Sequence, residues 1–173
     1  MNSSNARKID SDLQPDQDVD QYLTFRLAGE EYGVNILKVQ EIKGWSEVTP
    51  MPNTPEAILG VINLRGTVVP IVELRRHFNL PAAERGPTTV IIVVKAVDDK
   101  GNVRTMGMVV DAVSEVHNIA ASEVQPPPAV GDSGDQRAIA GLATMDGRMI
   151  ILLDIDELMI GGVLGMPDAA EEA

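Results

Sequence analysis

The sequence contains 173 residues, of which 44% are hydrophobic, and this is enough to form one domain or two small, closely packed ones. A formal net charge of −12 argues against nucleic-acid binding and against adsorption to anionic lipid, because no basic excess is present to displace counterions. Cysteine is absent, which excludes disulfides, thiolate nucleophiles and cysteine-ligated metals, and aromatic residues make up only 3% of the chain. We therefore expect a cytoplasmic protein with an aliphatic core and no direct membrane insertion.

The two ends of the chain differ in composition from the rest. Residues 1–19 are rich in Asp, Ser and Gln without periodicity, which predicts a disordered tail. No apolar segment follows the basic pair near the start, so this stretch does not have the pattern of a signal peptide. From Gly161 the residues are small and acidic, and we expect 161–173 to form a flexible C-terminal tail.

The first elements along the chain are predicted strands. Gln21–Leu27 alternates, with Leu23, Phe25 and Leu27 on a buried face and Tyr22, Thr24 and Arg26 on the other. A second strand is expected at about residues 31–36, and a turn followed by a strand at 37–43. Thr54-Pro55-Glu56 has the pattern of a helix start with Thr as N-cap, and it predicts a single helical turn.

A β-hairpin with arginine at its tip is the most informative local pattern. The apolar runs Gly60–Leu64 and Thr67–Leu74 flank Arg65-Gly66, and the glycine can supply the positive φ of a tight turn. Arginine has no propensity advantage at a turn, so function is sought first at this tip. Arg65 and Glu41 are polar residues inside apolar motifs, and either could make a charged contact across an interface. The alternative for Arg65 is a solvated loop position.

Further elements follow in order. Glu73–Leu80 predicts a short amphipathic helix, Thr88–Val97 a buried strand, and Val103–Val116 another strand. Residues 126–136 are rich in Pro, Gly and Asp and predict a mobile loop. A second hairpin lies within Gly141–Ile155, with Asp146-Gly147 as its turn. Asp154 is then the expected N-cap of a short helix, with Glu157 three residues later.

The chain contains an internal repeat. Gly33–Ile42 matches Gly107–Val116, and Gly60–Leu74 matches Gly141–Ile155, with Glu41 falling on Glu115 and Arg65 on Asp146. Val48, Pro50 and Pro52 likewise match Val124, Pro126 and Pro128. The pattern predicts two related units of about five short strands each, and it favours small β-barrels. A parallel α/β sheet is disfavoured because no segment has room for a crossover helix.

Catalytic patterns are weak. Asp154 and Asp156 follow an apolar strand and could bind Mg²⁺, but helix capping by Asp154 is the better interpretation, and a small Mg-dependent enzyme is the unfavoured alternative. His77 and His117 are the two histidines, and we assign both to surface or boundary positions, since neither belongs to a recognisable metal cluster or triad. We predict no catalytic residue, no metal and no cofactor. The pattern indicates a non-catalytic protein that binds other proteins.

Four motifs carry a resemblance to a known family. Glu30–Ile42, Gly60–Gly66, Val69–Leu74 and Gly107–Val113 closely resemble the chemotaxis coupling (adaptor) protein family CheW over about residues 20–160. The resemblance implies an all-β fold of two SH3-like five-stranded β-barrel subdomains with a few short helices and a hydrophobic cleft between them. The units are expected at roughly 20–87 and 88–160, exchanging terminal elements. It also implies a scaffold that couples methyl-accepting chemoreceptor tips to the histidine kinase CheA, recruited to receptor arrays at the inner face of the membrane.

The resemblance also implies two sets of binding residues. The kinase-binding set contains Glu41 and the loop residues Val124, Gln125 and Val130, with Gln125 standing where a basic residue can occur in the family. A coupling protein of a non-motility chemosensory pathway is an alternative that would use the same surfaces. The receptor-binding set is Val39, Gly60, Asn63, Leu64, Arg65, Gly66, Gly107, Val113 and Val116.

Overall fold

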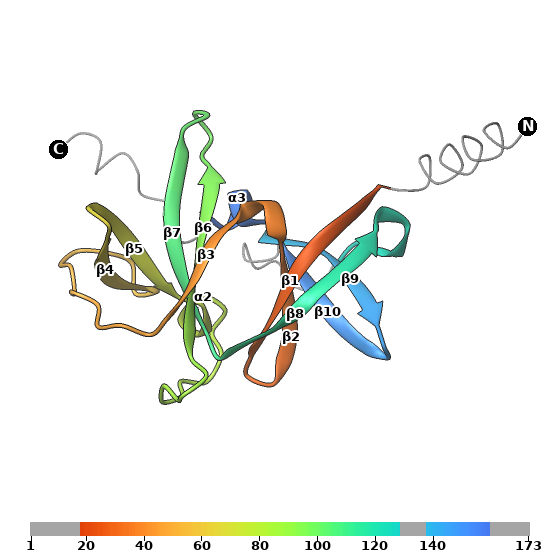
Figure 1. Cartoon of the computed structure of the whole chain (residues 1–173), viewed down its shortest axis with the longest axis horizontal. Coiled ribbons are helices and arrows are strands. Elements are labelled where there is room, and N and C mark those ends of the chain that lie inside the picture. The colour runs from red at the N-terminus through yellow and green to blue at the C-terminus, as the bar shows by residue number, and fades with distance from the viewer. Residues whose placement is uncertain (1–17, 129–137, 160–173) are drawn as a thin grey trace, which may run out of the picture.

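The computed structural model describes residues 18–128 and 138–159, which form ten strands and four short helical segments (Figure 1). The strands are β1 Val19–Leu27, β2 Glu30–Asn35, β3 Val39–Gly44, β4 Ile58–Leu64, β5 Thr67–Glu73, β6 Val90–Val97, β7 Val103–Val110, β8 Ala112–Ala120, β9 Ile139–Met145 and β10 Arg148–Leu153. The helical segments are η1 Ile36–Lys38, α2 Leu74–His77, η2 Ala121–Glu123 and α3 Ile155–Leu158.

The strands form two five-stranded sheets of matching topology. One sheet has the order β8-β1-β2-β10-β9 and the other β3-β6-β7-β5-β4. In each sheet one neighbouring pair is parallel, β10 with β2 and β5 with β7, and the remaining pairs are antiparallel. The predicted fold class, all-β with two five-stranded units and few short helices, is confirmed. Figure 1 shows the two sheets side by side along the long axis of the molecule.

Neither sheet corresponds to one half of the chain. β1 and β2 pair within the sheet that contains β8, β9 and β10, whereas β3, β4 and β5 belong to the sheet of β6 and β7. Each repeat therefore gives two strands to one sheet and three to the other. The segments that cross between the sheets, β2 to β3 and β7 to β8, are the ones whose sequences match as Gly33–Ile42 and Gly107–Val116.

Matched residues of the two repeats make matched contacts. Thr49 forms an isolated antiparallel bridge with Val61, and Gln125 forms the equivalent bridge with Leu142. A glycine precedes each strand partner, and a Cβ at Gly60 would overlap the carbonyl oxygen of Thr49. A Cβ at Gly141 would lie 2.9 Å from the carbonyl oxygen of Gln125. Close backbone approach therefore explains why glycine stands at both positions.

A single large core joins the two sheets. It includes Phe25 of β1 and Ile92 and Met106 from β6 and β7, and all three are fully buried. Phe25, Tyr32 and Phe78 stack in series with ring centroids 5.9 and 5.8 Å apart, so the few aromatic residues are concentrated here. Two smaller aliphatic clusters fill the individual sheets, one around Ile71 and Val93 and one around Ile150 and Leu152.

The prediction of a single strand at Val103–Val116 is wrong, because the structure divides this stretch into β7 and β8 at Asp111. The Asp111 carboxylate accepts hydrogen bonds from Arg75 at 3.1 and 2.7 Å and from the backbone N–H of Ala28 at 2.9 Å. Burial raises the pKa of Asp111, but the hydrogen bonds from Arg75 and Ala28 and the charge of Arg75 outweigh it, leaving the pKa below its usual value. This contact fixes the place where the chain leaves one sheet for the other.

Three other local expectations need correction. Thr54–Glu56 does not begin a helix; the Ile58 N–H donates to the Pro55 carbonyl at 2.9 Å in a turn, and the Thr54 hydroxyl donates to Met51 instead of capping. The helix expected at Glu73–Leu80 is limited to the four residues of α2. Thr24 is fully buried, because β8 covers it and its hydroxyl donates to the Glu115 carbonyl at 2.9 Å and accepts from the Glu115 N–H at 3.2 Å.

Other expectations are confirmed or lie outside the described residues. Strands at Gln21–Leu27 and Thr88–Val97 are present as β1 and β6, and Asp154 caps α3 by accepting from the Glu157 N–H at 3.1 Å. Apart from Asp18 and Val19, the predicted tail 1–19 lies outside the described residues, as do the tail 161–173 and most of the predicted loop at 126–136.

Candidate functional site

The tip of the β4–β5 hairpin has an unusual residue in a strained backbone position. Arg65 has φ of 50° and Gly66 has φ of 90°, as the two central residues of a type I′ turn require. A non-glycine residue in the left-handed region costs about 1 kcal/mol or more. Asn63 supports the turn by accepting a hydrogen bond from the Gly66 N–H at 2.8 Å. The chain therefore holds an arginine at this tip at some cost in stability.

Arg65 is paired with Glu41, so two residues singled out from the sequence meet in one contact. The two guanidinium NH groups donate to the two carboxylate oxygens at 3.2 Å each. Side-chain exposure is 66% for Arg65 and 28% for Glu41. Glu41 lies on β3 opposite Val93, which belongs to the aliphatic cluster within this sheet. Since β3 and β4 are the two edge strands of the sheet, the ion pair links its edges.

Arg65 also lines a cavity of about 220 Å³. Leu64 and Val69 form its apolar part and both are buried, whereas Gln40, Thr67 and Thr105 contribute polar groups. The combination of an exposed guanidinium, a neighbouring carboxylate and a cavity with a mostly polar lining is suited to recognition of a polar or charged group of another protein.

Two glycines of the expected receptor-binding set have packing roles. Gly60 lies beneath the Thr49 carbonyl, and Gly107 lies between side chains of Ile71 and Ile91, with a hypothetical Cβ only 2.7 Å from each. Both glycines allow close packing and present no side chain to a partner.

The valines of that set lie on the segments that connect the sheets. Val39 and Val113 are half-buried, and both pack against the core shared by the two sheets. Val116 is exposed on the edge strand β8. The set is therefore spread over both sheets, with Arg65 at a hairpin tip and the valines beside the junction.

The expected kinase-binding residues are also separated. Val124 packs against the aliphatic cluster of the first sheet, and Gln125 is exposed and exchanges two backbone hydrogen bonds of 2.8 Å with Leu142. Val130 lies outside the described residues. Glu41 is in the other sheet, where it contacts Arg65.

The Asp-x-Asp pattern is engaged in structural contacts. Asp154 is the cap of α3, and both carboxylate oxygens of Asp156 accept from Lys38 Nζ at 3.0 Å, one of them also from the Val97 N–H at 2.8 Å. In the described part of the chain no three His, Cys, Asp or Glu side chains are grouped as a metal site. Within the same residues no helix is long and apolar enough to cross a membrane.

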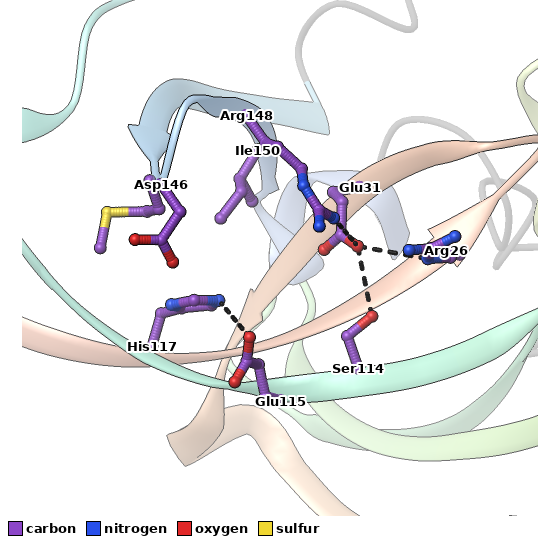
Figure 2. A pocket seen from close by; sticks show the side chains of 9 residues that line it. Arg26, Glu31, Ser114, Glu115, His117, Asp146, Arg148 and Ile150 are labelled. Carbon is purple, nitrogen blue, oxygen red and sulfur yellow. Dashed lines mark hydrogen bonds and ion pairs between the residues drawn. The ribbon is translucent and has the colours of Figure 1, made fainter.

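A second pocket, not expected from the sequence, lies at the tip of the β9–β10 hairpin. Its volume is about 190 Å³, and Figure 2 shows Glu31, Glu115, His117 and Asp146 around it. A surface or boundary position was expected for His117, and its side chain is 16% exposed, with Nε2 3.4 Å from Glu115. The internal repeat could have indicated this pocket, because Glu115 and Asp146 are the counterparts of Glu41 and Arg65.

Comparison with known proteins gives a consistent result. Residues 21–160 match the family model described as CheW-like domain. The chain is 39% identical to the chemotaxis protein CheW of Klebsiella aerogenes, over 86% of each chain. It is 38% identical to the chemotaxis protein CheW of Rhizobium meliloti, over 79% of this chain and 84% of that protein.

A solved structure supports the same comparison. The scaffolding protein TtCheW from Thermoanaerobacter tengcongensis superposes with a TM-score of 0.71 and 34% sequence identity, covering 81% of this chain and 92% of that chain. A more distant relative is the protein FrzA of Myxococcus xanthus, 28% identical over 88% of this chain and 91% of that protein.

Proposed function

Because the chain belongs to the CheW-like domain family, we propose that it is a non-catalytic adaptor that couples chemoreceptor cytoplasmic tips to a CheA-type histidine kinase. In this role the protein holds both partners at once, and a change in the receptor alters the conformational equilibrium of the kinase through the packed interfaces. The protein is then recruited from the cytoplasm to receptor arrays by its partners.

The observation that carries the proposal is the Arg65–Glu41 ion pair at the strained hairpin tip. Arg65 offers an exposed guanidinium in a fixed position, because Glu41 holds both of its NH groups and the turn restricts its backbone. Arginine is well suited to interface anchoring, since its planar head makes several hydrogen bonds at once. We propose that the receptor contacts Arg65 and the adjoining cavity, with Val39, Val113 and Val116 contributing apolar surface near the sheet junction.

We also propose a contact with the kinase, and it too rests on an exposed polar side chain. Gln125 is exposed beside Val124 on the loop before β9, so this loop can present a polar group to a partner barrel. The same surfaces would serve a coupling protein of a non-motility chemosensory pathway. The receptors that bind distinguish the two roles, and a panel of receptor fragments in the pull-down below identifies them.

The decisive experiment reverses the charge of Arg65. We expect Arg65→Glu to abolish most binding to a receptor cytoplasmic fragment and most kinase activation in a reconstituted ternary complex. Lys100→Glu is the matched control, because Lys100 is exposed in the turn between β6 and β7, does not line the cavity beside Arg65, and the substitution changes the charge equally. Circular dichroism and thermal unfolding of both variants establish that they are folded. A folded Arg65→Glu protein that couples normally would sink the proposal.

A further inference from the structure

Three exposed aliphatic side chains lie at the end of the second sheet where α3 meets β6. Leu37 of η1 is 83% exposed, Val103 at the start of β7 is 65% exposed, and Val97 at the end of β6 is 38% exposed. Val97 and Val103 are opposite each other in the antiparallel register, so their side chains lie on one face. Single exposed aliphatic residues are ordinary, whereas a group of them marks a surface that another segment covers. We call these three residues the apolar patch.

The carboxylate of Asp156 holds the parts of this patch together. It accepts from Lys38 Nζ at 3.0 Å through both oxygens, and Oδ1 also accepts from the Val97 N–H at 2.8 Å. Because Lys38 follows Leu37, one side chain of α3 connects η1 to the end of β6. The Asn35 side chain accepts from the Leu37 N–H at 2.8 Å, which fixes the backbone that presents Leu37. Figure 1 shows α3 beside β6.

The sequence after α3 supplies an apolar segment close to the patch. The described residues end at Met159, three residues beyond Asp156. The next seven, Ile160–Met166, read Ile-Gly-Gly-Val-Leu-Gly-Met and carry no charge, and acidic residues begin only at Asp168. An extended chain covers at most about 3.3–3.6 Å per residue, so Leu164 can lie up to about 17 Å from Met159. Met159 is less than one helical turn beyond Asp156, which is bonded to Val97, so the patch is within this reach.

We propose that Val163, Leu164 and Met166 of this chain fold back and pack on the apolar patch. Gly161 and Gly162 lie where the chain must reverse, and glycine permits the backbone angles of a tight reversal. A partner that binds at this end of the sheet must then displace the segment. The inference does not depend on the proposed coupling role.

A segment of the same chain is a better occupant than a second copy for two reasons. The short connection to α3 gives the segment an effective concentration on the order of 1 mM at the patch. A second copy would have to bring together two chains that each carry a net charge of −12. The segment itself is uncharged from residue 160 to residue 167, so its packing meets no such repulsion.

The test measures proximity with a spin label in the full-length protein. Because the chain contains no cysteine, Ala169→Cys provides a single site for a nitroxide. We expect the methyl signals of the apolar patch to lose most of their intensity and to recover when ascorbate reduces the nitroxide. The methyl signal of Met149, which is exposed on β10 of the other sheet, should keep its intensity. Loss of intensity at Met149 equal to that at the patch would overturn the proposal.

Two substitutions in the segment separate packing from mere nearness in sequence. Leu164→Asp, made in the Ala169→Cys protein, should restore most of the lost patch signal, because it places a charge where an apolar contact is proposed. Ala173→Asp is the control, since it adds the same charge beyond the apolar residues, and it should leave the loss unchanged. Patch signals that stay broadened in Leu164→Asp would overturn the proposal.

A matched pair of valines tests the patch itself. Val103 and Val68 are exposed to 65% and 63% on β7 and β5 of one sheet, but the register of β5 with β7 places them on opposite faces. Val103→Ser should restore most of the signal of Leu37 and Val97, and Val68→Ser should not. Both positions are exposed, and unchanged signals of buried methyl groups establish that each variant is folded. Equal behaviour of the two variants would refute the role of the patch.

A mixing experiment identifies which chain supplies the segment. Isotope-labelled protein without the nitroxide is combined with nitroxide-bearing protein that carries no isotope label. We expect the patch signals to keep their intensity in this mixture, because each chain covers its own patch. Loss of the patch signals in the mixture would show that a second copy supplies the segment, and it would overturn the intramolecular assignment. Absence of any loss in the singly labelled chain would overturn the proposal altogether.

Discussion

Replacing Gly60 with alanine tests whether this residue acts through packing or through partner contact. The new Cβ would overlap the Thr49 carbonyl oxygen, lie 2.7 Å from the Thr49 carbonyl carbon and 2.8 Å from a methyl group of Val48. The obstacle is backbone, which cannot rotate away as a side chain can. Gly60 also has φ of 150°, a conformation that residues with a Cβ rarely adopt.

The expected cost follows from the contacts that must break. Thr49 and Val61 exchange two backbone hydrogen bonds of 2.9 Å, and displacement of Thr49 removes both. Each contributes about 1 kcal/mol net, so their loss costs about 2 kcal/mol. Backbone strain at residue 60 adds about 1–2 kcal/mol. We therefore expect the free energy of unfolding to fall by about 3–4 kcal/mol, the sum of these contributions.

Urea denaturation followed by circular dichroism measures this change. Gly44→Ala is the control, because Gly44 is exposed at the end of β3 and a Cβ there meets nothing within 4 Å. It should stay within about 0.5 kcal/mol of the wild type. Gly141→Ala should be intermediate, since the Val124 side chain can move aside and φ at Gly141 is not in the left-handed range. A Gly60→Ala protein as stable as the control would refute the packing argument, and a loss of receptor binding in it would then indicate direct contact.

Three further changes test other contacts. Asp111→Asn should lower stability by about 1–2 kcal/mol at neutral pH, because the charged hydrogen bonds to Arg75 weaken but are partly screened by solvent. The pKa of Asp111 is lower in the folded chain than the unfolded value of about 3.9, so this stabilisation is complete above that pH and is lost as pH falls through the folded pKa. Unfolding curves at several pH values should therefore converge for wild type and variant only in acid; a constant difference would contradict the assignment. Asp154→Ala should cost about 1 kcal/mol through loss of the helix cap, and Mg²⁺ should leave the melting temperature of both proteins unchanged, whereas a Mg²⁺-dependent shift in the wild type alone would revive the enzyme alternative. Thr24→Val should cost about 1–3 kcal/mol in thermal unfolding, because it leaves the backbone N–H of Glu115 without its acceptor; a neutral effect would show that the Thr24 bonds are dispensable.

Only part of the candidate site could be predicted from the sequence. Arg65 could be singled out because arginine is an unexpected residue at a hairpin tip, and Glu41 because it interrupts an apolar motif. Their pairing could not be predicted, since 24 residues separate them and only closure of the sheet brings its two edge strands together. The pocket around Glu31 was missed for the same reason, because β2, β8 and the β9–β10 hairpin meet only in the folded sheet.

Local pattern determined the strands, the hairpins, the cap at Asp154 and the repeat, because alternation, turn residues and capping act over a few neighbouring positions. The break at Asp111 was decided by tertiary structure. Asp111 interrupts the apolar residues of this stretch, but no glycine or proline adjoins it, so the local sequence does not mark a turn there. The chain changes sheet at Asp111 because Arg75 and Ala28 converge on its carboxylate. Strand exchange between the repeats was also decided by tertiary structure. Two similar repeats can complete a sheet with their own strands or with each other's, and the shared core around Phe25 and Ile92 forms in the second arrangement.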